Sequence, residues 1–287
     1  MARMLCLFIF LFSFRYPLSS EETAIAELSS AAVRFHLHHG FLIVVPVQIG
    51  SEANLKFILD TGTSSTIVDR RVARRLGIRR GSPDKTICLH KSQKVESAVF
   101  PEVRFGPIRA TNATLLIADV SSLSEFADGV DGLLGLDLFW ERKISIDYDL
   151  KTLMVESASK ETGDSVQRRG ILCITTAAQI SGKPVRLVVD TGMKGVLLYE
   201  DRIRKLVPSL PASRSMQVLL GRTAPGSQTV LEKLRVGTAE IKNVDILLLS
   251  SAPAGVPPDI DGVLGTETLK ARRLTLDFSH SGVTWQH

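Results

Sequence analysis

One part of this chain recurs at a constant distance further along. Asp60-Thr61-Gly62 recurs as Asp190-Thr191-Gly192, and Asp131-Gly132-Leu133-Leu134-Gly135 recurs as Asp261-Gly262-Val263-Leu264-Gly265. The step from Asp60 to Asp131 is equal in length to the step from Asp190 to Asp261. An internal repeat constrains the architecture more than any single motif does. The chain therefore contains two related halves, and each half brings one carboxylate to an equivalent place.

The length of 287 residues suits one large domain or two of ordinary size. The repeat favours two lobes, which we place at residues 21–157 and 171–287, joined by a polar linker at 158–170. Each lobe is long enough to bury a core of its own. Apolar residues make up 44% of the chain and charged residues 23%, which is an ordinary globular balance.

Short β-branched and apolar runs separated by turn residues predict strands along most of the chain. Helical patterns are few, and the clearest are Asp69–Arg80 and Asp201–Leu206, with shorter ones at Leu136–Trp140 and Thr266–Ala271. Evenly spaced short strands indicate an all-β sandwich or barrel. The expected strands are Phe41–Ile49, Leu55–Leu59, Val99–Phe105, Thr114–Ile117, Lys143–Ile146 and Leu153–Glu156, then Ile171–Thr176, Val185–Val189, Ser215–Leu220, Val230–Val236, Asp245–Leu249 and Leu274–Phe278.

Residues 1–20 have the pattern of a secretory signal. Arg3 supplies a positive start, and the apolar run Leu5–Phe14 precedes the small residues Ser19 and Ser20. The run has the length of a signal h-region and is too short to span a bilayer. We expect a secreted or periplasmic protein with no membrane span after signal removal, and an uncleaved anchor is the alternative.

Cysteine and histidine give no clear metal or redox site. Cys88 and Cys173 remain after the expected signal, and either a disulfide between them or two separate thiols is consistent with export. His36, His38 and His39 cluster in sequence, but no carboxylate or cysteine stands near them at ligand spacing. A solvated strand end is the simpler explanation, so we expect no metal and no cofactor.

Much of the net charge of +5 lies in the arginine-rich segment Asp69–Arg80. Val72 and Leu76 lie four residues apart, as on the buried stripe of a helix, and arginines cover the rest. Such a face could bind an acidic polymer or lipid. A solvated helix face is the simpler interpretation, and we expect no nucleic-acid partner.

The repeated motifs together resemble the aspartic peptidases. Pepsin-like and retropepsin-like members share an apolar strand that ends in Asp-Thr-Gly, followed by a second apolar segment that ends in Gly. The flanks are most similar to bacterial retropepsin-like proteins, whose first strands read much like Val45–Ile49. The resemblance covers nearly the whole chain after residue 20. It implies two acid-protease β-barrel lobes with a few short helices, related by a pseudo-twofold axis within a monomer.

The resemblance also implies an aspartic endopeptidase whose partner is a peptide or protein substrate. Asp60 and Asp190 would face each other, share a proton and activate a water molecule between the lobes. Gly62 and Gly192 would let the backbone turn where a Cβ would clash. The alternative is an inactive peptide-binding protein with the same fold. Hydroxyls at Thr61 and Thr191 would bond across the axis, and the substrate-binding residues cannot be named from the sequence.

The two halves differ directly after the motif, because Thr63 in the first half corresponds to Met193 in the second. A hydroxyl at Thr63 could donate to the neighbouring carboxylate and lower its pKa, which a thioether cannot do. We therefore expect Asp60 to be the general base and Asp190 to hold the proton. A covering hairpin, or flap, is expected near Lys85–Val95. Leu220–Ser227 offers a second turn, so one flap or two remain open.

Overall fold

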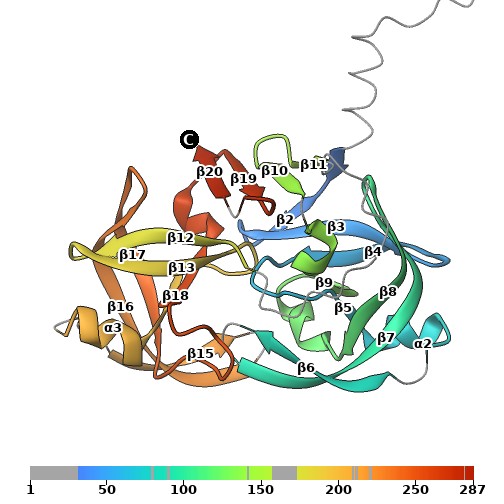
Figure 1. Ribbon diagram of the computed structural model, residues 1–287, viewed down its shortest axis with the longest axis horizontal. Helices are drawn as coiled ribbons and strands as arrows, with labels where there is room; N and C mark the ends of the chain where they lie inside the picture. The colour runs from blue at the N-terminus through green and yellow to red at the C-terminus, as the bar shows by residue number, and fades with distance from the viewer. Residues whose placement is uncertain are drawn as a thin grey trace, which may run out of the picture.

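A computed structural model describes residues 32–78, 81–88, 91–140, 142–156, 173–208, 210, 213–219, 222–280 and 282–287 (Figure 1). The expected signal at 1–20 and the expected linker at 158–170 lie outside the described residues. Two lobes of strands stand side by side, with the N-terminal lobe on the right of Figure 1 and the C-terminal lobe on the left. The all-β prediction is confirmed, since α-helix is confined to two short segments of the described chain.

The N-terminal lobe is built on a sheet with the strand order β2-β3-β4-β9-β5-β8-β7-β6, which β3 and β7 close by pairing. Its helical segments are α2 (Arg70–Arg75), η1 (Ser121–Glu125) and η2 (Leu136–Phe139). Its strands are β2 (His36–His38), β3 (Leu42–Ile49), β4 (Glu52–Leu59), β5 (Ile67–Asp69), β6 (Ser82–Cys88), β7 (Lys91–Phe105), β8 (Ile108–Ala118) and β9 (Gly132–Leu134).

The C-terminal lobe repeats this topology. Its strand order is β12-β13-β18-β14-β17-β16-β15, and β12 pairs with β16 as β3 does with β7. Its helical segments are α3 (Glu200–Leu206) and η3 (Thr266–Leu269). Its strands are β12 (Thr175–Ile180), β13 (Lys183–Asp190), β14 (Val196–Tyr199), β15 (Ser213–Leu219), β16 (Arg222–Val236), β17 (Ala239–Leu249) and β18 (Gly262–Gly265). The same path in both halves confirms the two homologous lobes expected from the repeat.

A third sheet joins the lobes in the order β1-β11-β10-β19-β20. Its middle pair is β10 with β19, one strand from each half, and Ser145 lies opposite Thr275, its own counterpart in the repeat. Their hydroxyls lie 3.2 Å apart. The pseudo-twofold axis therefore passes through this pair. The five strands are β1 (Ala32–Arg34), β10 (Lys143–Asp147), β11 (Thr152–Glu156), β19 (Arg273–Asp277) and β20 (Gly282–Gln286).

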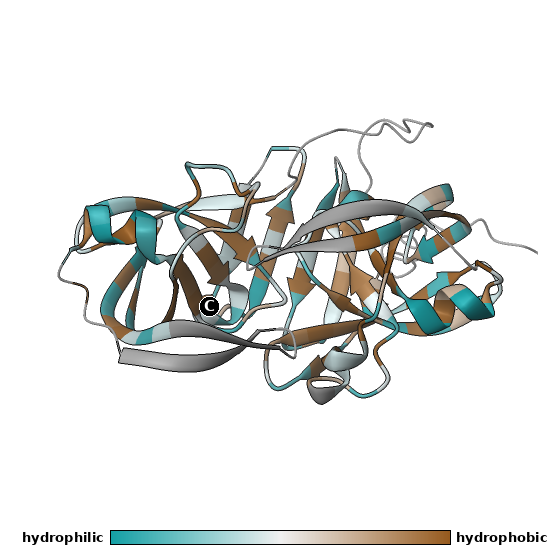
Figure 2. Cartoon of the chain, turned by 90° about the horizontal axis from the view of Figure 1, so that it is seen from below, coloured by the Kyte–Doolittle hydropathy of each residue, from teal (hydrophilic) through white to brown (hydrophobic). Residues whose placement is uncertain are grey.

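The shared sheet also fuses the cores of the two lobes, which we had expected to be separate. Ile144 and Ile146 on β10, and Leu274 and Leu276 on β19, are at most 1% exposed. They belong to one apolar cluster that extends into both lobes. Hydrophobic residues accordingly concentrate on the inner strands, while the short helices at the outside are hydrophilic (Figure 2). The lobes are two units by topology and one by packing.

The arginine-rich helix is shorter than expected. α2 begins after Asp69, whose carboxylate accepts a hydrogen bond from the Arg71 backbone N–H, and ends at Leu76. Val72 and Ala73 are its buried residues. The N-cap carboxylate satisfies a helix N–H that would otherwise lack a partner, which explains why the helix starts there.

Candidate active site

Asp60 and Asp190 occupy equivalent places where a central strand of each lobe ends. β4 pairs in parallel with β9, and the Asp60 backbone N–H donates to the Leu134 carbonyl at 3.0 Å. β13 pairs in parallel with β18, with Asp190 opposite Gly265. The second motif of each copy is therefore the strand that lies beside the carboxylate. The constant separation of the two motifs reflects this pairing.

The two loops approach each other so closely that a Cβ after the threonine would clash at Gly62 and would be crowded at Gly192. An ideal Cβ built at Gly62 would lie 2.3 Å from Oδ2 of Asp190. One built at Gly192 would lie 3.2 Å from Oδ1 of Asp60. Each glycine thus admits the carboxyl group of the opposite lobe, where we had expected a turn under the carboxyl group of its own lobe.

The two carboxyl groups are hydrogen-bonded to each other and to their own loops. Oδ1 of Asp60 accepts from the Gly62 N–H at 2.9 Å, and Oδ1 of Asp190 accepts from the Gly192 N–H at 2.7 Å. Both residues keep some exposed surface, but the carboxyl groups themselves are desolvated, and this raises the pKa of each. The negative charge of Asp60 raises the pKa of Asp190 further. The geometry suits one proton shared between two oxygens.

Thr61 and Thr191 lock the two loops together across the axis. The Thr61 hydroxyl donates to the Val189 carbonyl at 2.8 Å and accepts from the Thr191 N–H at 3.0 Å. The Thr191 hydroxyl donates to the Leu59 carbonyl at 2.7 Å and accepts from the Thr61 N–H at 3.2 Å. Both threonines are at most 1% exposed. The structure places these hydroxyls as the resemblance implied.

Thr63 does not act as the sequence suggested. Its hydroxyl donates to the Ser65 carbonyl at 3.3 Å and not to the Asp60 carboxylate. The Gly62 N–H bond and the contact with Asp190 lower the pKa of Asp60 against desolvation, whereas the Thr63 backbone N–H donates to the main-chain carbonyl of Asp60 at 3.4 Å. The Thr63 hydroxyl therefore gives no support to the expected order of acidity, in which Asp60 is the stronger acid.

A polar contact that we had not predicted stabilises the N-terminal half of the site. The Thr66 backbone N–H and hydroxyl donate to the Asp137 carboxylate at 2.9 and 2.6 Å, and the Gly135 N–H donates to the Thr66 hydroxyl at 3.1 Å. Burial raises the pKa of Asp137. The C-terminal lobe has Val196 and Glu267 at the equivalent positions. This difference between the two copies was the feature of the sequence that could have indicated the contact of Thr66 with Asp137.

Both lobes carry a long hairpin at the place where a flap was expected. β6 pairs with β7 from Ser82–Ser97 to Cys88–Lys91, and β15 pairs with β16 from Ser213–Gln228 to Leu219–Arg222. Both hairpins lie along the lower side of the molecule in Figure 1, and β6 and β15 approach each other there. The question left open by the sequence is thus answered at the level of the backbone, with one hairpin in each lobe.

Three of the four arginines of α2 form ion pairs within the fold. Arg70 pairs with Glu96 at 2.9 Å, Arg71 with Asp69 at 2.8 Å, and Arg75 with Glu52 at 3.2 Å. These ion pairs favour the solvated-face interpretation of α2 over an anion-binding face.

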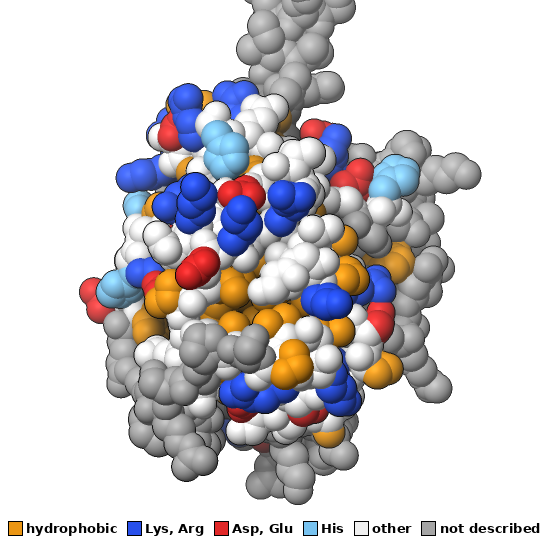
Figure 3. Space-filling model, turned by 90° about the vertical axis from the view of Figure 1, so that its left-hand side faces the viewer, with side chains coloured by type: hydrophobic (Ala, Val, Ile, Leu, Met, Phe, Trp, Pro, Cys, Tyr) orange, Lys and Arg blue, Asp and Glu red, His pale blue; other side chains and the backbone are white. Residues whose placement is uncertain are grey.

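Figure 3 looks at the end of the C-terminal lobe, where basic side chains lie above and below a band of hydrophobic ones and acidic side chains stand among them.

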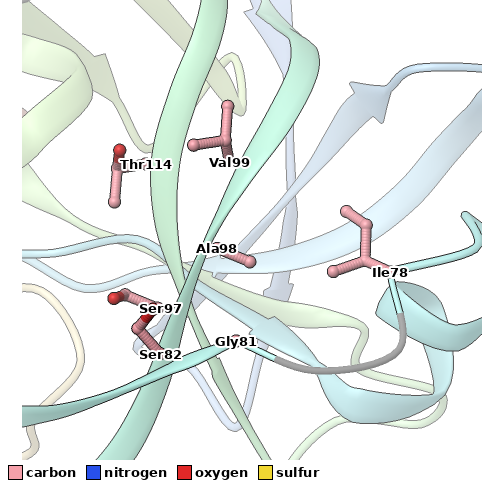
Figure 4. Close-up of a pocket in the computed structure, with 7 residues that line it drawn as sticks. All are labelled: Ile78, Gly81, Ser82, Ser97, Ala98, Val99 and Thr114. Carbon is pink, nitrogen blue, oxygen red and sulfur yellow. The ribbon is translucent and has the colours of Figure 1, made fainter.

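The remaining candidate sites lie apart from the two carboxylates. A pocket of about 500 Å³ in the N-terminal lobe is lined by residues that include Ile78, Ser82, Ser97 and Val99, and none of its lining belongs to an Asp-Thr-Gly segment (Figure 4). Among the described residues, no set of three His, Cys, Asp or Glu could hold a metal ion. In the same part of the chain, no helix has the length and apolar character to cross a membrane.

Cys173 is a free thiol whose pKa is raised by burial. The Cys88 side chain lies outside the described residues, as does His90. The predicted disulfide alternative therefore finds no support at Cys173.

Comparison with known proteins supports the repeat and the fold. A family model described as aspartyl protease matches residues 45–138 and 176–268, one range in each lobe. The crystal structure of an aspartic proteinase from Irpex lacteus superposes with a TM-score of 0.53, covering 89% of this chain and 97% of that chain at 15% identity. At this identity the similarity shows the fold alone. No curated protein matches the sequence.

Proposed function

Because the chain belongs to the aspartyl protease family, we propose that it is an endopeptidase in which Asp60 and Asp190 activate a water molecule against a peptide bond. The observation that carries the proposal is the pair of facing, desolvated carboxyl groups that hydrogen-bond to each other. A duplicated scaffold has no need of two buried carboxyl groups in contact, because burial of such groups is unfavourable unless they share a proton.

The proposed roles follow from the surroundings of each carboxyl group. The Asp60 carboxylate accepts the Gly62 N–H bond and is the ionised partner in this proposal. Asp190 holds the shared proton, because desolvation and the charge of Asp60 raise its pKa more. In the reaction Asp60 takes a proton from water as the water oxygen attacks the carbonyl carbon. Asp190 gives its proton to the carbonyl oxygen, so that a neutral tetrahedral intermediate forms without a covalent link to the protein.

The direct test is cleavage of a mixed peptide library between pH 3 and 8. Wild type is compared with Asp60→Asn and Asp190→Asn, and with Asp128→Asn as a control at an exposed carboxylate. We expect cleavage by wild type and the control, and a loss of about 10²–10⁴-fold in each dyad variant, the range for removing one acid or base. No cleavage by folded wild type, with peptide binding retained, would instead indicate an inactive peptide-binding protein.

A further inference from the structure

Arg202, in the first turn of α3, donates hydrogen bonds to several backbone carbonyls at the end of one loop. Its Nη1 donates to the Pro257 carbonyl at 2.7 Å and also to the Ile260 carbonyl, and its Nη2 donates to the Val256 carbonyl at 3.4 Å. The guanidinium carbon lies 5.1 Å from the centroid of the Tyr199 ring, which fixes its plane by a cation–π contact. One side chain thus holds two carbonyls of the loop that leads into β18 and the carbonyl of Ile260, which directly follows this loop.

This loop, Ser251–Asp259, has few other polar attachments. Two of its hydrogen bonds are local, from the Val256 N–H to the Pro253 carbonyl and from the Ile260 N–H to the Pro257 carbonyl, both at 3.1 Å. Its prolines have no N–H to donate. The ion pair of Asp259 with Arg186 joins two side chains that are each more than half exposed, and such pairs add little stability. Arg202 is therefore the loop's principal polar anchor.

The anchored loop packs beside the strand that carries Asp190. Val256 and Ile260 are 7% and 2% exposed, and they belong to the same apolar cluster as Val188, two residues before Asp190. Met193, three residues after Asp190, packs against this cluster. The loop therefore shares an apolar cluster with residues on both sides of Asp190 in the chain.

The N-terminal lobe makes the equivalent contact with different chemistry. Arg71 of α2 donates from Nη2 to the Val130 carbonyl at 3.1 Å, and Val130 is the repeat counterpart of Ile260. The buried Asp69 carboxylate orients Arg71 through a 2.8 Å bond to Nε, in the place that Tyr199 takes in the other lobe. In both halves an arginine therefore donates to the equivalent carbonyl, directly before the Asp-Gly motif, and a different side chain supports it in each lobe.

We propose that Arg202 is a positioning residue that holds the loop Ser251–Asp259 as a wall of the substrate site beside Asp190. This wall and Met193 together restrict the size of one substrate side chain next to the cleaved bond. The inference rests on the proposed endopeptidase function. The pseudo-twofold axis passes between the two carboxyl groups, so the substrate residues that flank the bond face different lobes. Only one of them meets this wall.

The anchoring role can be measured without any activity. Lysine keeps the charge of Arg202, but its ammonium lacks the planar fork that reaches three carbonyls. Hydrogen–deuterium exchange of Arg202→Lys should accelerate by at least about tenfold at the Val256 and Ile260 amides, the factor expected for the loss of one hydrogen bond to a charged group. The matched control, Arg235→Lys on β16, should leave these amides unchanged. Equal exchange in wild type and Arg202→Lys would overturn the anchoring role.

The specificity role is tested with the peptide library under conditions of cleavage. Arg202→Lys and Met193→Ala should each accept larger side chains at one flanking position, and Arg202→Lys should raise KM severalfold with little change in kcat. The hydrogen bonds of Asp60 and Asp190 are untouched, so the pH profile should not move. An unchanged cleavage pattern, or equal change at both positions, would refute the specificity role while the endopeptidase function stood. Absence of cleavage by wild type would refute the endopeptidase function, and the exchange experiment would still show whether Arg202 holds the loop.

Discussion

Replacement of Thr191 by valine tests the contact that joins the two halves of the site. Valine keeps the volume and branching of threonine and removes only the hydroxyl. The Leu59 carbonyl then loses its donor at 2.7 Å, and the Thr61 N–H loses its acceptor at 3.2 Å. Both groups lie beside side chains that are at most 1% exposed, where water cannot replace the lost partner.

The expected destabilisation follows from these two lost bonds. A buried polar group left without a partner costs about 1–3 kcal/mol, so two such groups should lower the free energy of unfolding by about 2–6 kcal/mol. That is a large part of the roughly 5–15 kcal/mol typical of a folded protein. Thr61→Val removes the mirror-image pair of bonds, and its effect should be of the same size.

Urea unfolding at constant pH measures the effect, provided that the slope m is unchanged. Thr284→Val, at an exposed position on β20, is the matched control and should change stability by no more than about 0.5 kcal/mol. A loss for Thr191→Val that equals the control would show that the cross-axis bonds contribute nothing net, and the argument for a locked dyad would fail.

Three further results are expected. Because the pKa of Asp190 is raised, the folded state binds this proton more tightly than the unfolded state does. The stability of wild type should therefore fall as pH rises above the ordinary carboxyl pKa. Thermal unfolding of Asp190→Asn should accordingly show its greatest gain in stability over wild type at pH 7, and little gain near pH 3. Gly262→Ala should destabilise the fold by about 1–3 kcal/mol or more in urea, since its Cβ would lie 2.1 Å from the Leu197 carbonyl oxygen, whereas Gly282→Ala, with its nearest neighbour at 3.8 Å, should be close to neutral. Cys173 should react with iodoacetamide more slowly than a free cysteine at pH 8, because burial raises the pKa of its thiol; a reaction as fast as that of a model thiol would contradict this.

The repeat made the lobes and the facing carboxylates predictable, because equal spacing of two motifs in both halves is typical of a duplicated folding unit. The hairpins were underestimated, since the first part of β7, Lys91–Ser97, is polar and only Val99–Phe105 has the expected strand pattern. The shared sheet was missed because the pairing of Ser145 with Thr275 depends on how two lobes dock, which no local pattern records.

The side-chain details of the site were harder still. Thr63 was assigned a donor role from its residue type, but its hydroxyl has a nearer acceptor in the Ser65 carbonyl. The contact of Thr66 with Asp137 joins two distant parts of the chain and becomes visible only when strand pairing has placed them together. Residue identity limited the possible donors, and backbone geometry selected among them.

The shared sheet can be completed only late in translation of the chain. β10 ends at Asp147, but its partner β19 begins only at Arg273, and Asp60 emerges from the ribosome long before Asp190. At about 5–20 residues per second, roughly 7–26 s pass between the two carboxylates. Until Asp190 is made, the nascent chain holds only one of the two carboxylates, and until β19 is made, β10 is paired on one edge alone, with β11. The proposed activity needs both carboxylates, so a chain of this design cannot acquire it before much of its second half has been translated.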